Sequence, residues 1–448
     1  MIGLLCWGIV LPLERKSKPA LPLALVPMLL GLALGGLQLI PAGQTLRTFL
    51  SPQATEWRET LAPTDQPPTA LPPGSRVASH TAPGQSRLPL SIDPAATRRQ
   101  LALLAMAVAA FALGARFFRH RHPQLVLCLA VAINGAGIAS LGIVQRISGN
   151  YSYLGASVKG GGSFGSYFNE NNAAGYLSMC LACGLAVLYW LLARNRAPAG
   201  PMFADGIPLA APAPSSRWAE YWSGVCHFIG NLGASTLGIW LVLGLLLAGV
   251  LCSMSRGGCL ALAIATPLTL FAARRGKGIA GFYWSLAIAA VLSTCLVGWL
   301  GVARVIERRW ATLLDLSGMV GDGRIGNWAE SLRALGDYWL LGSGLGTYGY
   351  AYLPYQQRYN NAWHLHAENQ YLEALMDGGF VGLVLLGAQL ALLVLALRKL
   401  FRERAEAAGA GLVVGGMLLV LTQSLHAVVD FGLYLPANFL LFATVCGS

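Results

Sequence analysis

The chain has 448 residues, of which 55% are hydrophobic and only 11% are charged, and its formal net charge is +12. A mean hydropathy of +0.56 is too high for a soluble domain and is typical of a polytopic membrane protein. Eight of the nine cysteines fall in apolar runs and Cys226 lies in a loop, so neither a disulfide framework nor a redox site is indicated.

Long apolar runs follow one another along the chain. They are continuous over about 17 to 25 residues and lack the alternation of barrel strands, so they predict membrane helices. A run at 2–13 is too short to span a bilayer comfortably and is left unassigned. We therefore expect an all-α integral membrane protein with about 10 to 12 transmembrane helices. The expected helices lie at 20–41, 100–117, 123–145, 172–193, 234–252, 257–273, 280–301, 376–397, 410–427 and 432–447.

The charges of the short loops predict the orientation, because Lys and Arg near helix ends are retained in the cytoplasm. Five alternating loops hold 16 basic and five acidic residues, so they carry +11 of the formal net charge of +12. The basic excess is thus a topology signal and does not indicate a nucleic-acid partner.

This orientation divides the chain into three parts. Residues 1–301 are expected to form N-terminal transmembrane helices with a Pro-rich outer loop at 42–99. Residues 302–375 form a large outer loop, and residues 376–448 form the C-terminal transmembrane helices. The unusual polar motifs FNENNAAGYL, SRGG, GRIGNW, WHLHAENQ and HAVVDFGLYLPAN all fall on the outer side. A functional site that faces outward is therefore predicted.

Arginine dominates the basic residues of the 302–375 loop, which holds six arginines and no lysine. A guanidinium group binds phosphate oxygens through paired hydrogen bonds and keeps its charge, so it suits a polyanionic ligand. Seven acidic residues in the same loop leave ion pairing as the alternative for most of these arginines. Arg256 differs, because it lies between two apolar runs with no acid nearby in sequence, which makes it a candidate ligand-binding residue.

Two histidines precede the segment AENQYLEALM, which is expected to form a helix that ends at Gly378 and Gly379. An imidazole can take a proton from a hydroxyl nucleophile near neutral pH, so His366 is a candidate general base. The alternative is a histidine that caps or packs at the start of the helix. His364 is expected to point elsewhere and to be structural.

No metal or other cofactor is expected. The H-x-H pair with Glu368 is compatible with zinc, but the other outer histidines are only His80 and His426, and the outer loops hold no cysteine. The glycine-rich stretch GSGLGTYG at 342–349 follows no βαβ pattern, which argues against a dinucleotide site. We expect it to form a turn whose backbone N–H groups face an anion.

Six stretches together resemble the O-antigen ligase and polymerase superfamily of bacterial membrane glycosyltransferases, and their order and spacing carry the resemblance over nearly the whole chain. It implies a helical membrane fold of the GT-C type with a large periplasmic loop between two late helices. It also implies transfer of a glycan from an undecaprenyl diphosphate carrier to an acceptor, without a metal. The stretches are PLSIDPAATRRQLALLA (89–105), GSFGSYFNENNAAGYL (162–177), SRGG (255–258), GRIGNW with GDYWLLGSGLGTYGYAY (323–352), HLHAENQYLEALMDGGFVGL (364–383) and HAVVDFGLYLPANFLLF (426–442).

The resemblance assigns roles to individual residues. His366 matches the loop histidine of the family, and Arg256 and Arg324 match its diphosphate-contacting arginines. The stretch VDFGLYLPAN looks more like the branch associated with exopolysaccharide assembly than like lipopolysaccharide ligases, which leaves the acceptor open. Supporting candidates within the matching motifs are Asn169, Asn171, His364, Glu368, Asn369 and Asp430.

Residues and resemblance together imply an inverting displacement in the bacterial inner membrane, with the active site facing the periplasm. The expected partners are an undecaprenyl diphosphate-linked glycan, an acceptor glycan or lipid, and membrane lipids. Two other classes stay open, namely a polysaccharide transporter or flippase and a non-catalytic glycan-binding component of an envelope assembly. A transporter would be expected to show repeats and charges at the membrane midplane, whereas the polar motifs collect at one face.

Overall fold

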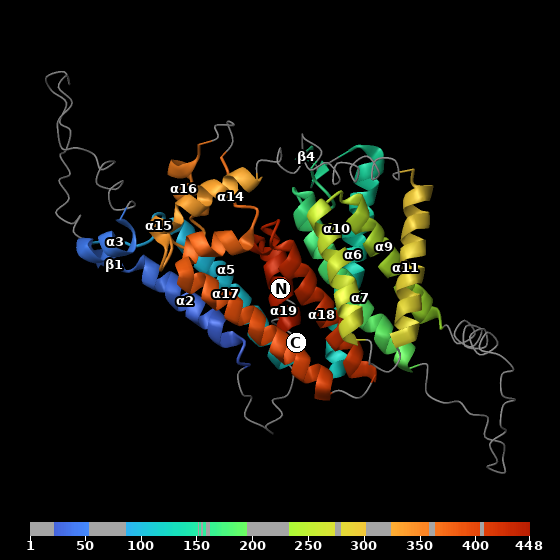
Figure 1. Cartoon of the computed structure of the whole chain (residues 1–448). Coiled ribbons are helices and arrows are strands. Elements are labelled where there is room, and N and C mark those ends of the chain that lie inside the picture. The colour runs from blue at the N-terminus through green and yellow to red at the C-terminus, as the bar shows by residue number, and fades with distance from the viewer. Residues whose placement is uncertain are drawn as a thin grey trace, which may run out of the picture. The chain divides into compact units, whose positions relative to one another are not determined.

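The computed structural model describes residues 22–52, 87–150, 152–153, 156–157, 162–194, 233–273, 279–301, 324–357, 363–403 and 407–448. The run at 2–13, most of the Pro-rich loop and the start of the 302–375 loop lie outside these ranges. The chain divides into two compact units, each assembled from segments that are distant in sequence (Figure 1). Unit 1 comprises Met1–Ala20, Ala110–Leu316 and Leu393–Ser448, and unit 2 comprises Leu21–Ala109 and Ser317–Leu392.

Within the described ranges, six helices are long and apolar enough to cross a membrane. These are α5 (Pro94–Phe117), α6 (Arg121–Ser148), α7 (Glu170–Arg194), α9 (Ala234–Cys252), α10 (Arg256–Ala273) and α17 (Gln370–Glu403). Shorter apolar stretches lie in α2 (Leu25–Leu39), α11 (Ile279–Trp299), α18 (Ala407–His426) and α19 (Pro436–Gly447). Each expected apolar run overlaps one of these helices, so the all-α membrane class is confirmed. The number of crossings and the orientation stay predictions.

Helix α7 forms the centre of unit 1. It packs against α6, α9, α10 and α18, and its side chains are buried along nearly its whole length. Leu177, Met179, Leu185 and Leu188 are among the largest fully buried side chains of the protein. A helix that is apolar on all sides is suited to such a central position, because every face meets another helix. The remaining elements of unit 1 are the hairpin strands β3 (Ser152–Tyr153) and β4 (Ala156–Ser157) and the 3-10 turn η2 (Gly432–Tyr434).

Small residues allow α18 to approach α7 closely. A Cβ atom on Gly411 would lie 2.9 Å from the backbone oxygen of Ala186, and one on Gly415 would lie 2.7 Å from that of Ala182. The two glycines are four residues apart and therefore lie on the same face of α18. This is the small-xxx-small arrangement that lets membrane helices pack backbone to backbone.

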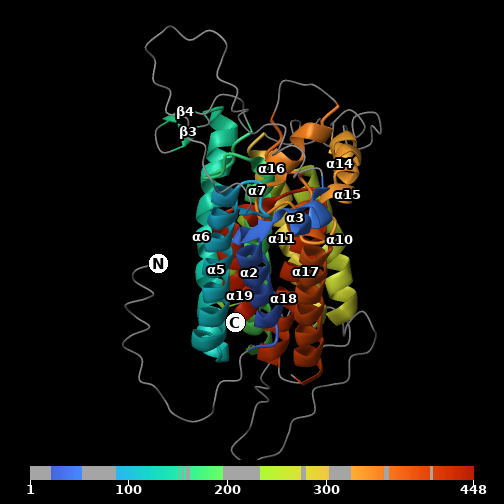
Figure 2. The ribbon, with the colours of Figure 1, turned by 90° about the vertical axis from the view of Figure 1, so that its left-hand side faces the viewer.

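Unit 2 contains α2 and most of α5 and α17, which lie side by side (Figure 2). Gly35 of α2 packs against Leu101 of α5, and Leu34 packs against Gly378 and Gly382 of α17. Helix α5 begins earlier than the apolar run because the Asp93 carboxylate caps its first turn, accepting the N–H of Ala95 at 2.9 Å. The short elements of unit 2 are β1 (Pro41–Gly43), α3 (Gln44–Leu50), β2 (Arg87–Pro89), α14 (Arg324–Arg333), α15 (Leu335–Tyr338), α16 (Tyr348–Ala351) and η1 (Leu353–Tyr355).

Residues 339–344, which lead into the glycine-rich stretch, form hydrogen bonds with α17 at a break in the helix. The helix is interrupted at Gly379, whose φ of 63° and ψ of −163° are not helical. Before the break, the carbonyl groups of Met376 and Asp377 accept the N–H groups of Ser343 and Gly344. After it, Phe380 and Val381 donate to the carbonyl groups of Trp339 and Leu340. Backbone groups released by the break are thus satisfied by residues 339–344.

The predicted anion at this turn is the protein's own Asp377. Its carboxylate is buried and accepts the N–H of Gly346 at 2.7 Å and that of Thr347 at 3.2 Å. The chain reaches it through positive φ angles at Gly342, Gly344 and Gly346, which glycine adopts without a Cβ penalty. The turn therefore fixes the first part of α17 and does not offer a binding site for an external anion.

Candidate functional site

The histidine segment leads directly into α17 in unit 2. Asn369 caps the helix, because its side-chain oxygen accepts the N–H groups of Tyr371 and Leu372, both at 3.1 Å. The backbone at Glu368 has a φ of 50°, which is unusual for a residue with a side chain. Asn369 and Glu368 therefore define the turn between His366 and the helix.

His366 forms a pair with Glu373 of the first turns of α17. Its Nδ1 atom lies 2.7 Å from Oε1 of Glu373, whose other oxygen accepts the N–H of Ala367 at 3.3 Å. The Glu373 side chain is 1% exposed and that of His366 is 32% exposed. An ionised carboxylate can only accept hydrogen bonds, so Nδ1 is the donor in this pair, and in the neutral tautomer the lone pair is then on Nε2. This arrangement orients the imidazole ring so that Nε2 points away from Glu373 and, in the neutral tautomer, can act as a base.

The other polar residues of this segment contact α14. Arg324, at the start of α14, forms an ion pair with Glu368. Asn327 lies one turn further on, and its side-chain nitrogen is 3.5 Å from Nδ1 of His364. His364 also packs edge-on against the ring of Tyr352. The two histidines therefore have different partners, and both belong to the same unit as Arg324.

Buried aromatic residues pack against the histidine segment. Tyr338, Tyr348 and Tyr352 form a cluster with Met376 and Ala367. Burial raises the pKa of Tyr348 well above its ordinary value, so its hydroxyl stays protonated and shares a hydrogen bond with Ser331. Trp328 donates its indole N–H to the carbonyl group of Ala367 at 2.7 Å. Packing of this kind holds the histidine segment against α14 and α17.

Arg256 begins α10 in unit 1, directly after a sharp turn. Met254 has a φ of 65° and, with Glu368, is one of two non-glycine residues with positive φ in the part of the chain that the structure describes. Ser253 and Ser255 are buried, and the N–H of Gly258 donates to the Ser255 hydroxyl at 3.1 Å, which caps α10. Strained backbone persists where the surroundings fix it, and such positions cluster at functional sites.

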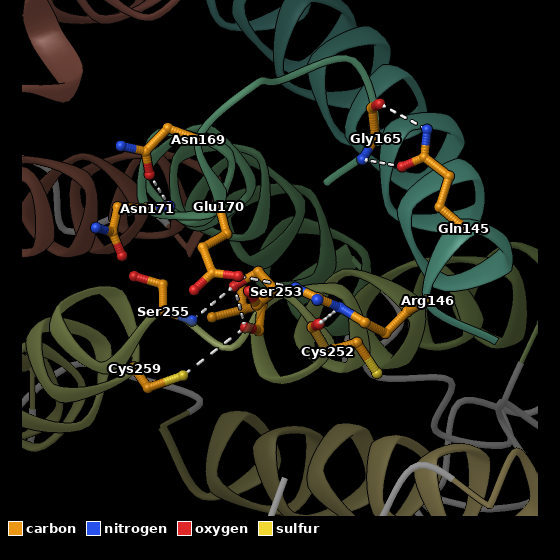
Figure 3. A network of polar contacts seen from close by, with 11 residues as sticks. Gln145, Arg146, Gly165, Asn169, Glu170, Asn171, Cys252, Ser253, Ser255 and Cys259 are labelled. Carbon is orange, nitrogen blue, oxygen red and sulfur yellow. Dashed lines mark hydrogen bonds and ion pairs between the residues drawn. The ribbon is translucent and has the colours of Figure 1, made fainter. Parts of the chain in front are cut away.

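Arg146 holds this turn from the end of α6 (Figure 3). Its Nε donates to the carbonyl of Cys252 at 3.1 Å, and its Nη2 donates to that of Ser253 at 3.1 Å. The same Nη2 forms an ion pair with Glu170 at 2.9 Å. Since both side chains are mostly buried, the pair fastens α6, the start of α7 and the α9–α10 turn to one another.

Two supporting candidates flank Glu170 at the start of α7. The Asn169 side-chain oxygen accepts the N–H of Asn171 at 2.8 Å, as expected for a residue that precedes the first helical turn. Figure 3 shows Asn169 and Asn171 on the same side of the network as Ser255. Asn169 therefore has a capping role in the structure.

Asp430 lies in a buried polar junction of unit 1. Its side chain is 2% exposed, and its Oδ2 atom is 3.9 Å from Nε2 of His426. A Cβ atom on Gly257 would lie 3.6 Å from that same nitrogen, so the first turn of α10 packs on His426. The first turn of α19 contributes Asn438, which donates to the carbonyl of Asn172 at 3.1 Å. Asp430 thus belongs to the packing that surrounds the start of α10.

The candidates therefore fall into two groups. Unit 2 brings together His364, His366, Glu368, Asn369 and Arg324, and unit 1 contains Arg256, Asn169, Asn171 and Asp430. The convergence of Arg256 with Arg324 and His366 involves both units and stays a prediction. The described residues contain no group of three or more His, Cys, Asp and Glu side chains that could hold a metal ion.

Two functional candidates were missed by sequence reasoning. Glu373 belongs to the polar stretch that contains His366, but it lies seven positions further along the chain, and the chain turns between them at Glu368. Arg146 directly follows an expected span and lies at its outer end, so its position in the sequence was a usable signal. Its partner Glu170 lies within the FNENN motif.

Comparison with known families agrees with the motif pattern. Residues 241–387 match the family model described as O-antigen ligase. The matched segment includes Arg256, Arg324, His366 and Glu373, whereas Asn169, Asn171 and Asp430 lie outside it. No curated protein matches the chain. Residues 241–387 are therefore similar to the O-antigen ligase family, which confirms the resemblance of the chain to the O-antigen ligase and polymerase superfamily.

Proposed function

We propose that the protein transfers a glycan from an undecaprenyl diphosphate carrier to an acceptor hydroxyl, with inversion at the anomeric carbon and without a metal. The single observation that carries this proposal is the buried carboxylate of Glu373 on Nδ1 of His366, within the segment that matches the O-antigen ligase family. A buried acid that orients an imidazole is the arrangement of a general base.

The reaction is a single displacement. Nε2 of His366 accepts the proton of the acceptor hydroxyl as its oxygen forms a bond to the anomeric carbon. The bond between that carbon and the diphosphate oxygen breaks on the opposite side, and the electron pair leaves with the diphosphate. Glu373 stabilises the imidazolium that forms, because its carboxylate faces the Nδ1–H.

Arginines neutralise the leaving group in this scheme. Arg256 and Arg324 supply fixed positive charge where the diphosphate develops negative charge, which is the role of electrostatic stabilisers in transfer reactions. Arg146 and Glu170 position Arg256 indirectly, since they fix the turn that precedes it. Glu368 holds Arg324 in an ion pair, and the donor diphosphate would compete for this partner.

The proposed setting is the inner membrane, with the site facing the periplasm. The donor's prenyl chain would lie in the lipid phase, and the acceptor would be a growing polymer or a lipid-anchored glycan. Support comes from the membrane-helix content and from the family match.

The test is incubation of the purified protein with a defined undecaprenyl diphosphate oligosaccharide and candidate acceptors, followed by mass analysis of the products. We expect a product whose mass is the sum of glycan and acceptor, with release of undecaprenyl diphosphate. Donor binding without turnover, equal in wild type and in His366→Ala, would instead favour a glycan-binding component. Uptake of the lipid-linked glycan across liposomes without any transfer would favour a flippase.

A further inference from the structure

His426 is a buried histidine that the proposed transfer reaction does not use. It is the last residue of α18, and its side chain is 3% exposed. Helices α7 and α10 of the same unit both pack against α18. An ionisable side chain buried among membrane helices is a candidate for a functional role, and its contacts indicate which role that is.

The imidazole ring lies between two glycine positions. A Cβ atom on Gly175 of α7 would be 3.2 Å from Nδ1 and 3.5 Å from Cε1 of His426. At the opposite edge of the ring, a Cβ atom on Gly257 of α10 would be 3.5 Å from Cδ2 and 3.6 Å from Nε2. Neither helix has a side chain where it meets the ring, so the imidazole itself fills the space between the two backbones.

The segment around His426 fixes the position of the ring. Gln423, one turn earlier on α18, donates to the carbonyl group of Gly175 at 2.9 Å. After the helix, Val429 donates its N–H to the carbonyl group of His426 at 2.9 Å. The Val429 side chain also meets α10, because a Cβ atom on Gly257 would lie 2.6 Å from its Cγ2. The ring is therefore held in place relative to both α7 and α10.

These contacts bear on Arg256, because Gly257 follows it in the first turn of α10. The next residue, Gly258, packs on α7, since its Cβ atom would lie 2.6 Å from the Cβ atom of Ala174. The first turn of α10 is thus held between α7 and the end of α18. A change in either contact would move the Arg256 side chain, which projects from the same turn.

We propose that His426 is a positioning residue for Arg256: its ring spaces the first turn of α10 from α7 and so sets the place at which the guanidinium group meets the donor. The inference rests on the proposed function, in which Arg256 binds the donor diphosphate. A guanidinium group and a diphosphate form paired hydrogen bonds only in a defined geometry, so a displacement of about 1 Å is enough to weaken the interaction.

The experiment compares three variants of the full chain in detergent. His426→Ala removes the spacer. His426→Phe keeps an aromatic ring but removes Nε2, which lies 3.9 Å from Oδ2 of Asp430, so it separates the size of the side chain from its polar contact. Gly415→Ala is the matched control, because it disturbs the packing of α18 at a position whose nearest neighbours are atoms of α7.

The first measurement is backbone hydrogen exchange, followed by mass spectrometry on peptides that cover residues 254–260. It does not depend on catalysis. His426→Ala should exchange faster than the wild type in these peptides, because the first turn of α10 loses its contact with the ring. His426→Phe and Gly415→Ala should keep the wild-type exchange rate there.

The second measurement is transfer from the defined lipid-linked donor. His426→Ala should raise the KM for the donor by up to about 100-fold and leave the KM for the acceptor nearly unchanged. In an Arg256→Lys background, the same substitution should raise the donor KM much less, because residues that act through one another are not additive. A merely structural role would lower the active fraction, and hence kcat, without this coupling.

Unchanged exchange of residues 254–260 in His426→Ala would overturn the inference, as would an equal effect on the donor KM with and without Arg256→Lys. Equal losses in His426→Phe and His426→Ala would assign the effect to the contact with Asp430 and reject the spacer.

Should His426→Ala fail to fold, Gly175→Ala decides the question, because its methyl group presses on the ring from α7. An unaltered donor KM together with unaltered exchange in Gly175→Ala would reject the spacer. Absence of transfer in the wild type would contradict the proposed function, whereas the exchange measurement would still show whether His426 holds the first turn of α10 in place.

Discussion

Nδ1 of His366 lies 2.7 Å from Oε1 of Glu373, a carboxylate that is buried beneath the start of α17. The second oxygen of Glu373 is held by the backbone N–H of Ala367, so the carboxylate has one orientation and fixes the ring that it contacts. The relationship makes the direction of Nε2 depend on Glu373.

Glu373→Gln should lower kcat roughly 10- to 100-fold while leaving the KM for the donor nearly unchanged, because the amide no longer stabilises the imidazolium. Steady-state kinetics on the defined donor and acceptor measure this split. Glu330→Gln is the matched control, since Glu330 is also a buried carboxylate of unit 2 and accepts a hydrogen bond from Tyr352 at 2.5 Å. Equal losses of kcat in both variants would mean that Glu373 acts only through the fold.

His366→Ala should lower transfer about 100- to 10,000-fold with the fold intact, as is typical for the loss of a general base. His364→Ala should cost much less, because His364 contacts Asn327 and Tyr352, whereas the hydrogen bond to Glu373 comes from His366. Product formation under single-turnover conditions separates the two variants. Equal losses at normal expression would contradict the assignment of the base to His366.

Arg324→Lys should raise the KM for the lipid-linked donor, because lysine keeps the charge but loses the paired hydrogen bonds of the guanidinium group. Glu368→Gln should have the opposite effect and lower the KM for the donor, since it removes the carboxylate that pairs with Arg324 in the absence of donor. Donor titrations at saturating acceptor test both. A higher donor KM in Glu368→Gln would show that the ion pair assists binding and does not compete with it.

Gly415→Ala should destabilise unit 1 by about 1 to 3 kcal/mol, because the added methyl group meets the rigid backbone of α7. The position of that methyl group would be 2.7 Å from the Ala182 oxygen. Gly238→Ala in α9 serves as the control, since nothing lies within 4 Å of its Cβ position. Thermal unfolding in detergent compares the two, and equal midpoints would contradict the close packing of α7 and α18.

The orientation can be tested with engineered cysteines. A cysteine at the exposed position Leu353, in the 302–375 loop, should react with an impermeant maleimide in intact cells. A cysteine at Arg402, in a predicted cytoplasmic loop, should react only after the cells are opened. Because Cys295 is exposed in α11, the background must be free of native cysteines. Protection of the Leu353 site in intact cells would reverse the predicted topology.

The sequence predicted the helices well, because runs of apolar residues long enough to span a bilayer leave few alternatives to a helix. It was less informative at their ends. Hydropathy placed the start of one helix at 100, whereas α5 begins at Pro94, because capping by Asp93 extends the helix into polar sequence. The break at Gly379 was predicted as a helix end, but hydrogen bonds with residues 339–344 let α17 continue beyond it.

Within the candidate site, sequence reasoning identified the polar residues but could not identify their partners. Asn369 proved to be a helix cap, a role visible from its place before a helical pattern. The partner of His366 depends on one residue in a left-handed conformation, Glu368, and no propensity predicts such a conformation for glutamate. Arg146 meets the α9–α10 turn across more than a hundred residues, a distance that local patterns do not bridge.

The segment at 339–344 completes the hydrogen bonding of α17. A chimera with a related protein must therefore exchange this segment and α17 together. A chimera that exchanges α17 alone would join a broken helix to a foreign turn, and the backbone groups on both sides of Gly379 would lose their partners. Exchange of 335–392 as one block keeps donor and acceptor segments from the same parent. Chimeras within the superfamily should thus have their boundaries before Leu335 and after the break at Gly379. A boundary between Gly346 and Asp377 would separate the Gly346 N–H from the Asp377 carboxylate that accepts it.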